Sequence, residues 1–307
     1  MEFNFLMLSA MYENGGNTAH RFLDGHPEMF VYPFESQLGT RLVQDSLSSI
    51  FPVKYRWPVF DLSATAFQNY KAIIDEECKV RARTPQVSKF RNMPFAFSDD
   101  ERCSLFEKHM AGATNTRAEL VAAFFKTTFD SWKNFRKTGA ERTYVGYSPI
   151  IVVDAEKILE ELPRAHILHV VRNPWSAYAD TKKRPVPLSL EQYLTAWVLN
   201  QYYATTSQSI YTDRVHIIRF EDMVVDPCGC LGAICKAIGL QSAESLKIPT
   251  WNGEPLAEVY PWGTIRKATA EQNIATALEL SADEIEAVRL RALPYLERFN
   301  YQDFLKT

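Results

Sequence analysis

Four short runs of apolar and β-branched residues lie along the chain, and each run ends in a loop. They cover Phe5 to Ser9, Thr143 to Gly146, His166 to Val171 and Val215 to Phe220. Runs of this length without strict polar alternation are typical of strands buried on both faces of a parallel sheet. We therefore predict four parallel strands.

Helix signals follow these strands. A helix is predicted over Thr18 to Leu23, while Ser148 and Asn173 each precede a proline, the pattern of an N-cap followed by proline at the first helical position. After the last strand, Gly229 to Ile238 is predicted helical and closes at Gly239. This alternation predicts an α/β fold with three layers, α/β/α, around a central parallel sheet. Such a sheet binds ligands at the carboxyl ends of its strands.

The interval from Pro58 to Gly139 interrupts the alternation. It has helical periodicity, aromatic residues and no convincing strand. We interpret residues 58–139 as a helical insertion that shapes a substrate pocket, within a single domain over residues 1–307. Near the end of the chain, Ser281 to Phe299 is predicted as a structural helix with a capping box of Ser281 and Glu284.

The composition is that of a folded globular protein, with 307 residues, 46% of them hydrophobic and 23% charged. A net charge of -3 disfavours a nucleic-acid binder. The apolar N-terminal stretch is too short to span a bilayer and follows Glu2, so we predict neither a signal peptide nor a membrane helix, and expect a cytoplasmic location. Buried free thiols are favoured over a metal site for the cysteines, because no His or Cys pair has zinc spacing. They are Cys78, Cys103, Cys228, Cys230 and Cys235.

The loop after the first strand has the features of a phosphate site. Gly15 and Gly16 relax its backbone, and the free amides at the start of the next helix face it. Glu13 occupies the position where such loops usually keep a lysine or arginine. A negative charge in a phosphate loop needs an explanation.

Two later strand ends also carry charged side chains. Arg172 ends the strand AHILHVV, beside the ligand crevice, where a guanidinium can bind a phosphate with two hydrogen bonds. The alternative is an arginine paired with a neighbouring carboxylate. In VHIIRFEDMVVDP, Arg219, Glu221 and Asp222 are predicted to form a buried ion-pair corner with a structural role.

These three segments together resemble the sulfotransferases that use 3′-phosphoadenosine 5′-phosphosulfate, PAPS. ENGGNTAHRFLDGHPE is similar to the family motif RSGTTLLxxLLDxHPE, VVRNPWSAYAD to VVRNPxDxxxS, and RFEDMVVDP to RYEDLVxDP. Each string alone is a weak signal, but the combination in this order is specific. The resemblance implies a P-loop-containing nucleotide hydrolase-like fold, PAPS as donor, PAP as product and no metal.

The resemblance also implies roles for individual residues. The 5′-phosphosulfate would lie in a cradle formed by Asn14, Gly15, Gly16, Asn17 and Thr18. Arg172 would bind the 3′-phosphate. Arg266 and Lys267 resemble the late basic segment that folds over the nucleotide, with a solvated basic pair as the alternative. The nearby Trp251 and Trp262 are candidates to cover the adenine, although core packing explains them as well.

Several positions depart from the family motifs. Glu13 replaces a basic residue, and Gly16 and Asn17 replace two threonines. Asp180 stands where a family serine contacts the 3′-phosphate, so it is counted with the donor-binding positions, and Tyr147 stands where a lysine is usual. The missing cation must come from elsewhere, with Lys89 and Arg91 as candidates against a solvated face. Otherwise the protein is slow or inactive.

The reaction also needs a base that takes a proton from the acceptor. In one branch of the family a glutamate shortly after the HPE element has this role, and Glu35 in YPFES is the nearest match. Glu13 and His20 are the other candidates.

Three functions are compared. The first is a sulfotransferase that acts on a hydroxyl or amine of a small molecule, without nucleic-acid or membrane partners and compatible with an oligomer. The second is a catalytically inactive sulfotransferase-like protein that works as a nucleotide-binding or interaction module. The third, a small-molecule P-loop kinase, is disfavoured because ENGGNT lacks the GK[ST] ending of a Walker A loop.

Overall fold

The computed structural model describes residues 3–258 and 269–305. Its centre is a five-stranded parallel sheet in the order β2-β3-β1-β4-β5. The strands are β1 (Phe5–Ala10), β2 (Met29–Val31), β3 (Thr143–Tyr147), β4 (Ala165–Val171) and β5 (Val215–Arg219). The four predicted strands are confirmed to within one residue at each end, and β2 was missed.

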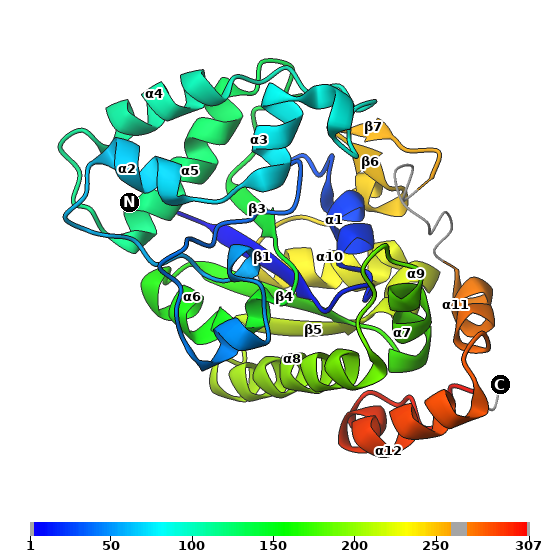
Figure 1. Cartoon of the computed structure of the whole chain (residues 1–307). Coiled ribbons are helices and arrows are strands. Elements are labelled where there is room, and N and C mark those ends of the chain that lie inside the picture. Colours follow the sequence, from blue (N-terminus) through cyan, green and yellow to red (C-terminus); the bar gives the residue numbers. More distant parts are fainter. Residues whose placement is uncertain (1–2, 259–268, 306–307) are drawn as a thin grey trace.

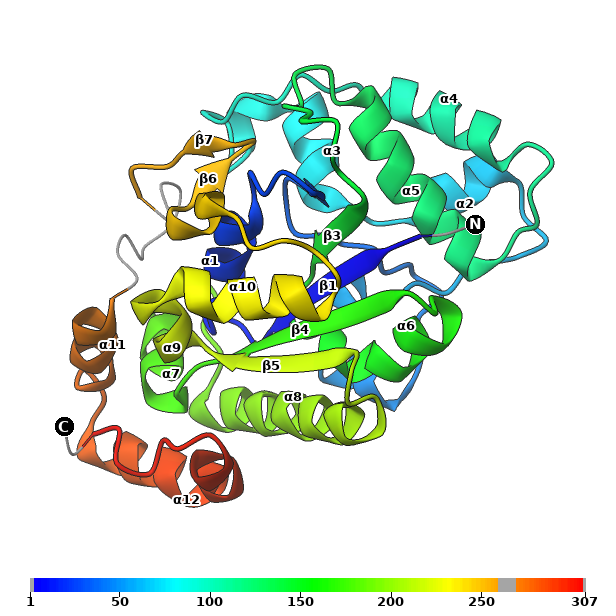
Figure 2. The ribbon, with the colours of Figure 1, turned by 180° about the vertical axis from the view of Figure 1, so that it is seen from behind.

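Helices cover both faces of this sheet, which confirms the predicted three-layer α/β/α fold (Figures 1 and 2). The α-helices are α1 (Gly16–Leu23), α2 (Ala66–Ala72), α3 (Glu76–Arg83), α4 (Asp99–Met110), α5 (Arg117–Ser131), α6 (Ala155–Glu161), α7 (Pro174–Lys182), α8 (Leu190–Ile210), α9 (Phe220–Val225), α10 (Pro227–Ala237), α11 (Ala270–Ala277) and α12 (Ala282–Arg298). Short 3-10 helices are η1 (Ser46–Ser49), η2 (Val53–Tyr55), η3 (Pro85–Val87), η4 (Ile151–Asp154) and η5 (Glu244–Lys247). A small hairpin joins β6 (Thr250–Trp251) and β7 (Glu254–Pro255).

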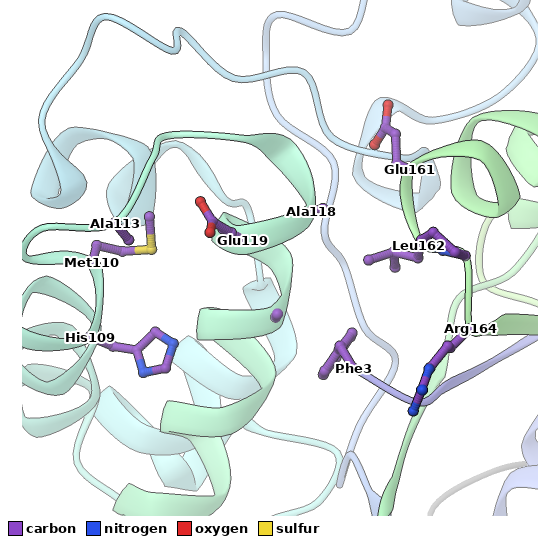
Figure 3. A pocket seen from close by; sticks show the side chains of 11 residues that line it. Phe3, His109, Met110, Ala113, Ala118, Glu119, Glu161, Leu162 and Arg164 are labelled. Atoms are coloured by element: carbon purple, nitrogen blue, oxygen red, sulfur yellow. The ribbon is translucent and has the colours of Figure 1, made fainter. Parts of the chain in front are cut away.

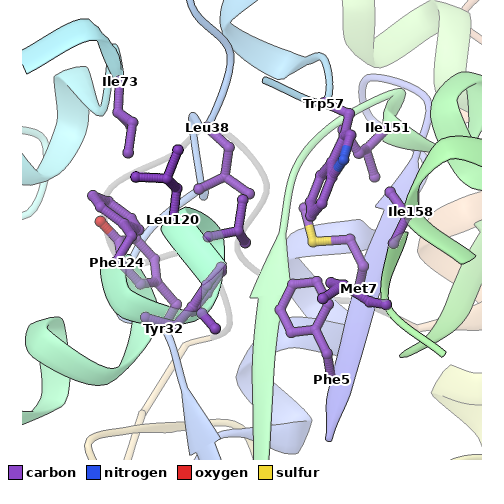
Figure 4. Close-up of a cluster of buried hydrophobic side chains, with 14 of the residues drawn as sticks. Phe5, Met7, Tyr32, Leu38, Trp57, Ile73, Leu120, Phe124, Ile151 and Ile158 are labelled. Atoms are coloured by element: carbon purple, nitrogen blue, oxygen red, sulfur yellow. The ribbon is translucent and has the colours of Figure 1, made fainter. Parts of the chain in front are cut away.

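The central strand β1 is buried on both faces because its side chains alternate between two hydrophobic clusters. Leu6 and Leu8 pack with residues of α1 and α10. Phe5 and Met7 point the other way, into a cluster with residues of α5 and α6 (Figure 4). This two-sided burial explains why β1 reads as an unbroken apolar run in the sequence.

Helices α2 to α5 occupy the region between residues 58 and 139. They gather on the β3 side of the sheet, whereas α12 lies on the β5 side (Figures 1 and 2). The segments on either side of α3 contact the segment that follows β2, since the Asp75 amide donates to the Gln37 carbonyl and Lys89 lies 3.8 Å from Glu35. Among the described residues, no helix combines the length and hydrophobicity needed to cross a bilayer.

Two predicted helix starts had different outcomes. Asn173 caps α7 as predicted, because its Oδ1 accepts a hydrogen bond of 2.9 Å from the Ser176 amide. Ser148 is not an N-cap, since η4 begins only at Ile151 and the Ser148 hydroxyl instead donates to the Tyr55 carbonyl. The predicted capping box of Ser281 and Glu284 is confirmed at α12.

Candidate functional site

The β1–α1 loop brings the first amides of α1 to the carboxyl end of the sheet. Glu13 has φ of 59° and Gly15 has φ of 87°, so both are in the left-handed region. Left-handed residues of this kind occur in the turns that form anion-binding nests. No side chain caps α1, and the first N–H groups of a helix have no partner within the helix. The loop therefore has the geometry of a phosphate site.

Two aromatic rings flank this loop. A β-carbon at Gly15 would lie 2.1 Å from Cδ2 of Phe220, the residue that begins α9. A β-carbon at Gly16 would lie 2.4 Å from Cε2 of Tyr147, the last residue of β3. Both glycines are thus required by close approach, and Tyr147 places its hydroxyl group at the start of α1, where the family usually has a lysine.

Asn14 anchors the loop from inside the protein. Its Oδ1 accepts hydrogen bonds of 3.1 Å from the Arg172 amide and from Nε1 of Trp197. Its Nδ2 donates to the Tyr193 hydroxyl at 3.1 Å. The Asn14 amide donates to the Met11 carbonyl. This side chain therefore ties the loop to β4 and α8, whereas Asn17 is half-buried at the start of α1.

Arg172 lies at the end of β4 as predicted, and its guanidinium is bound on several sides. Nη1 donates to the Glu13 carbonyl and to Oδ2 of Asp180, both at 2.8 Å. Nε donates to Oδ1 of Asn273, on α11, at 2.7 Å. The side chains of Arg172 and Asp180 are 5% and 3% exposed. The alternative that Arg172 pairs with a neighbouring carboxylate is confirmed, and that carboxylate belongs to Asp180.

The pair formed by Arg172 and Asp180 belongs to a larger charged cluster. Lys183 lies 3.1 Å from Oδ1 of Asp180 and 2.9 Å from Oε2 of Glu279. Two cations thus face two carboxylates, so this group is electrically balanced. A phosphate that binds Arg172 must either share the guanidinium with Asp180 or displace that carboxylate.

The corner after β5 differs from the predicted buried ion pair. Glu221 accepts hydrogen bonds from the amides of Asn173 and Asn273 and from the Tyr301 hydroxyl. Arg219 pairs instead with Asp222, 3.6 Å away, whose side chain is 58% exposed. The buried carboxylate therefore joins neutral donors from three segments, and the ion pair lies at the surface.

Glu13 projects from the loop toward a cation. Its Oε1 lies 3.8 Å from Nε of Arg184, whose guanidinium also covers the Tyr12 ring at 4.9 Å. Burial raises the pKa of Glu13 above its usual value, while the positive charge of Arg184 acts in the opposite direction. Arg184 thus supplies a cation next to the loop position that lacks one.

Glu35 lies near Glu13 and the loop. It is 8% exposed, and its carboxylate is hydrogen-bonded to Tyr55 of η2. Burial raises the pKa of Tyr55, and the negative charge of Glu35 raises it further. Nζ of Lys89 lies 3.8 Å from Oε1 of Glu35. The candidate base therefore has a hydroxyl donor and a cation beside it.

His20, the third candidate base, faces the protein interior. It is 1% exposed, and its ring lies 5.5 Å from that of Tyr147. Burial and the neighbouring Arg21 hold the pKa of His20 well below its usual value. Nη2 of Arg21 is 2.7 Å from Nδ1 of His20. The fully buried ring packs between α1 and β3.

A cavity of about 690 Å³ opens beside the loop. Tyr12, Tyr55 and Arg184 line it on the side of Glu13 and Glu35, and its apolar lining includes Ile50, Pro52 and Leu188. A second cavity of about 540 Å³ lies at the opposite, amino end of the sheet (Figure 3). Because parallel sheets bind ligands at their carboxyl ends, the first cavity is the candidate substrate pocket.

The remaining predicted positions have varied locations. Arg266, Lys267 and Trp262 lie outside the described residues. Trp251 is 2% exposed and stacks on Phe90, so it belongs to the core. Arg91 is exposed. All five cysteines are free thiols, but only Cys78, Cys103 and Cys235 are buried as predicted, whereas Cys228 and Cys230 are half-buried. The described part of the chain contains no group of three or more His, Cys, Asp or Glu side chains arranged for a metal ion.

Some residues of this site were missed in the sequence. Arg184 follows the basic run after α7 and resembled a solvated charge, while Tyr12 was seen only as part of the loop. Glu77, in the first turn of α3, read as an ordinary acidic helix start. The one available signal was the position of Tyr12 just after the end of the first predicted strand, and no signal marked Arg184.

Comparisons with known proteins agree with this architecture. A sequence profile of the sulfotransferase family matches residues 39–244. No curated protein sequence matches the chain. The structure resembles the sulfotransferase domain from the curacin biosynthetic pathway, with a TM-score of 0.54, 12% identity, and coverage of 94% of this chain and 97% of that one.

Two further solved structures resemble the chain more loosely. The sulfotransferase domain from the Synechococcus PCC 7002 olefin synthase has a TM-score of 0.48 and 16% identity, with 91% of this chain and 94% of that one covered. The sulfotransferase from Alicyclobacillus acidocaldarius has a TM-score of 0.42 and 16% identity, with coverage of 94% and 96%.

The profile match spans most of the chain. It begins after the β1–α1 loop and includes Arg172 and the segment RFEDMVVDP, so the assignment does not depend on the loop alone. The parallel sheet, the strand-end arginine and the profile match lead to one conclusion, that this chain belongs to the sulfotransferase family.

Proposed function

We propose that this chain transfers a sulfuryl group from PAPS to a hydroxyl or amine of a small-molecule acceptor and releases PAP. Family membership supports the reaction class. The observation that carries the proposal is the placement of Glu35, which is buried behind the 690 Å³ cavity and hydrogen-bonded to Tyr55, a residue of the cavity wall. Tyr55 thus connects the candidate base to the pocket, and Tyr12 and Arg184 connect the loop to the same pocket.

In the proposed reaction, the acceptor oxygen or nitrogen attacks the sulfur atom of PAPS. The bond to sulfur forms as the bond between sulfur and the 5′-phosphate oxygen breaks, and the electron pair stays on PAP. Glu35 takes the proton that the acceptor loses. In-line positioning and stabilisation of the departing phosphate supply most of the remaining rate enhancement.

For the donor, we infer that backbone amides at the start of α1 hold the 5′-phosphosulfate, with Gly15, Gly16, Asn17 and Thr18 as the contact positions. Asn14 holds that loop in place. Arg172 is proposed for the 3′-phosphate, with Asp180 as its competitor.

The proposal also assigns roles to nearby cations and to the helices of the insertion. Arg184 lies 3.8 Å from the Glu13 carboxylate and Lys89 lies 3.8 Å from the Glu35 carboxylate, and we assign both cations to the charge on the departing phosphate. Arg266 and Lys267 stay predicted as further cations. The helices between residues 58 and 139 are proposed to close the acceptor pocket, and the cytoplasmic location remains a prediction.

The test is an assay of purified protein with ³⁵S-labelled PAPS and a panel of phenols, alcohols and amines. We expect labelled product from the wild type and a loss of about 10²- to 10⁴-fold in turnover for Glu35→Gln, with PAP binding retained. Glu119→Gln is the matched control, because Glu119 lines the cavity at the opposite end of the sheet. Equal turnover for Glu35→Gln and Glu119→Gln would refute the role of Glu35.

An inactive sulfotransferase-like protein makes a different prediction. It would bind PAP, as measured by calorimetry, and give no labelled product with any acceptor. The charge of Glu13 in the loop and the Asp180 carboxylate on Arg172 make this comparison necessary. Detection of sulfated product excludes that alternative, whereas absence of PAP binding by the wild type refutes the donor assignment itself.

A further inference from the structure

Three charged side chains meet beside the phosphate loop. Glu35 comes from the segment after β2, Glu77 from the first turn of α3, and Lys89 from the segment after η3. Nζ of Lys89 lies 2.5 Å from Oε1 of Glu77 and 3.8 Å from Oε1 of Glu35. One lysine therefore serves two carboxylates, and the closer bond is to Glu77.

Glu77 is held firmly while Lys89 is not. The Glu77 amide donates to Oε1 of Gln37 at 3.3 Å, and its carboxylate accepts a backbone hydrogen bond from Glu35. Oε2 of Glu77 is buried and has no hydrogen-bond partner among the described residues. The side chain of Glu77 is 16% exposed, whereas that of Lys89 is 41% exposed. Lys89 is therefore the more exposed partner, and its flexible four-carbon side chain can change direction with less loss of packing.

Other titratable groups face this pair from neighbouring segments. Tyr55, on η2, is hydrogen-bonded to Glu35 and feels the charge of Glu77. Tyr12 and Glu13, in the β1–α1 loop, both feel the charge of Glu35. The carboxylate of Glu13 also contributes to stabilising the ammonium group of Lys89. The lysine thus lies within the electrostatic reach of the loop.

The electrostatics place a proton equilibrium at Glu77. Burial raises the pKa of Glu77 to about 7, with a further contribution from the negative charge of Glu35. Burial alone would lower the pKa of Lys89, but the carboxylates of Glu35 and Glu77 outweigh it and raise that pKa. Near neutral pH, Glu77 changes charge while Lys89 stays cationic.

We propose that Glu77 is a positioning residue that holds Lys89 away from the donor and releases it on taking up a proton. This inference rests on the proposed function, because it makes Lys89 the cation for the phosphosulfate of PAPS. With Glu77 ionised, the ammonium group stays on its carboxylate. With Glu77 protonated by solvent, the ammonium group loses that partner and its flexible side chain turns to the phosphate groups in the loop.

The coupling between proton uptake by Glu77 and nucleotide binding predicts how PAP affinity depends on pH. If binding of an anionic nucleotide draws Lys89 away, the bound state favours the protonated form of Glu77 and takes up a proton. Affinity for the nucleotide therefore rises as the pH falls through the region near 7. Uptake of one proton can change the affinity for the nucleotide by at most about tenfold per pH unit.

The experiment measures PAP binding by calorimetry from pH 6 to pH 8 and needs no acceptor. We expect Glu77→Gln to bind PAP at pH 8 about tenfold more tightly than the wild type and to lack this component of the pH slope. Glu76→Gln is the matched control, since Glu76 is the adjacent residue, is 54% exposed and pairs with Lys54. The control should keep the wild-type slope, which also corrects for protonation of PAP itself.

A second variant tests the partner. Lys89→Met should lose PAP affinity at pH 6 and show the same flattened slope, and urea unfolding checks that the variant folds, because Glu35 and Glu77 both lose their cation. Equal slopes for the wild type, Glu77→Gln and Lys89→Met, together with measurable binding, would overturn the inference and leave the proposed function standing. Absence of PAP binding in every protein at every pH would refute the proposed function and this inference together.

Discussion

Replacing Asp180 with serine should convert a self-neutralised site into a receptor for a 3′-phosphate. Oδ2 of Asp180 lies 2.8 Å from Nη1 of Arg172, and both side chains are almost fully buried. Lys183 and Glu279 complete the electrically balanced cluster. The serine restores the residue type found at this position in the family motif and leaves the cluster with one excess positive charge.

The size of the expected gain in PAP affinity follows from the hydrogen bond between Arg172 and Asp180, for which the 3′-phosphate no longer competes in the variant. A hydrogen bond to a charged group contributes about 1.5–3 kcal/mol, and in the wild type a 3′-phosphate gives up part of this to Asp180. We therefore expect Asp180→Ser to bind PAP about 10- to 150-fold more tightly than the wild type. Adenosine 5′-phosphate has no 3′-phosphate, so its affinity should change little.

Calorimetry with PAP and with adenosine 5′-phosphate separates a gain specific to the 3′-phosphate from a general gain in nucleotide affinity. Asp130→Ser serves as the matched control, because Asp130 is an exposed residue on α5. Urea unfolding of each variant checks the fold, since breaking a buried ion pair costs about 3–5 kcal/mol. An equal gain for both nucleotides would mean that the 3′-phosphate is not involved. An unchanged PAP affinity in folded Asp180→Ser would refute the assignment of Arg172 to that phosphate.

Three further predictions concern stability and are measured by urea unfolding. Gly16→Ala should lower the free energy of unfolding by about 1–3 kcal/mol, because its β-carbon would overlap Tyr147. Adding Tyr147→Ala to the same chain should recover part of this loss. An unchanged stability of Gly16→Ala would contradict the close contact. Arg56→Ala should lose about 3–5 kcal/mol, because the 1% exposed carboxylate of Asp154 keeps only the half-exposed Lys157 as its cation, and a loss below about 1 kcal/mol would show that the pair is dispensable. Burial lowers the pKa of His169 to about 4 from its ordinary 6.5, so below pH 6.5 the unfolded chain binds a proton that the folded chain does not. The free energy of unfolding should therefore fall by up to about 1.4 kcal/mol per pH unit from pH 6.5 to 4, and His169→Phe should remove this contribution. If the wild type and His169→Phe lost stability equally with falling pH, the result would argue against a buried neutral ring at His169.

Much of the fold was predictable because its strands are buried on both faces. The residues from Phe5 to Ala10 are all buried, so no polar alternation obscured the strand. β2 was missed because Met29–Val31 spans only 3 residues, too few for a periodic signal. The cap at Asn173 was predicted correctly and the cap at Ser148 was not, since a tertiary contact with Tyr55 takes the Ser148 hydroxyl.

The site was predictable only where it follows strand ends. Arg172 was located by the strand that precedes it, but its binding to Asn273 depends on how α11 packs on α7. The contact between Glu77 and Lys89 joins two segments of the helical region through tertiary packing. No local pattern in the sequence distinguishes such residues from solvated charges.

The contact between Gly16 and Tyr147 turns two departures from the family motif into a single exchange. A threonine at position 16 would place its β-carbon inside the space of the Tyr147 ring. A tyrosine at position 147 in this orientation therefore requires glycine at position 16, and we expect the two positions to covary among close homologues. The two departures from the motif are thus physically coupled, so that restoring a threonine at position 16 requires a smaller or differently placed side chain at position 147.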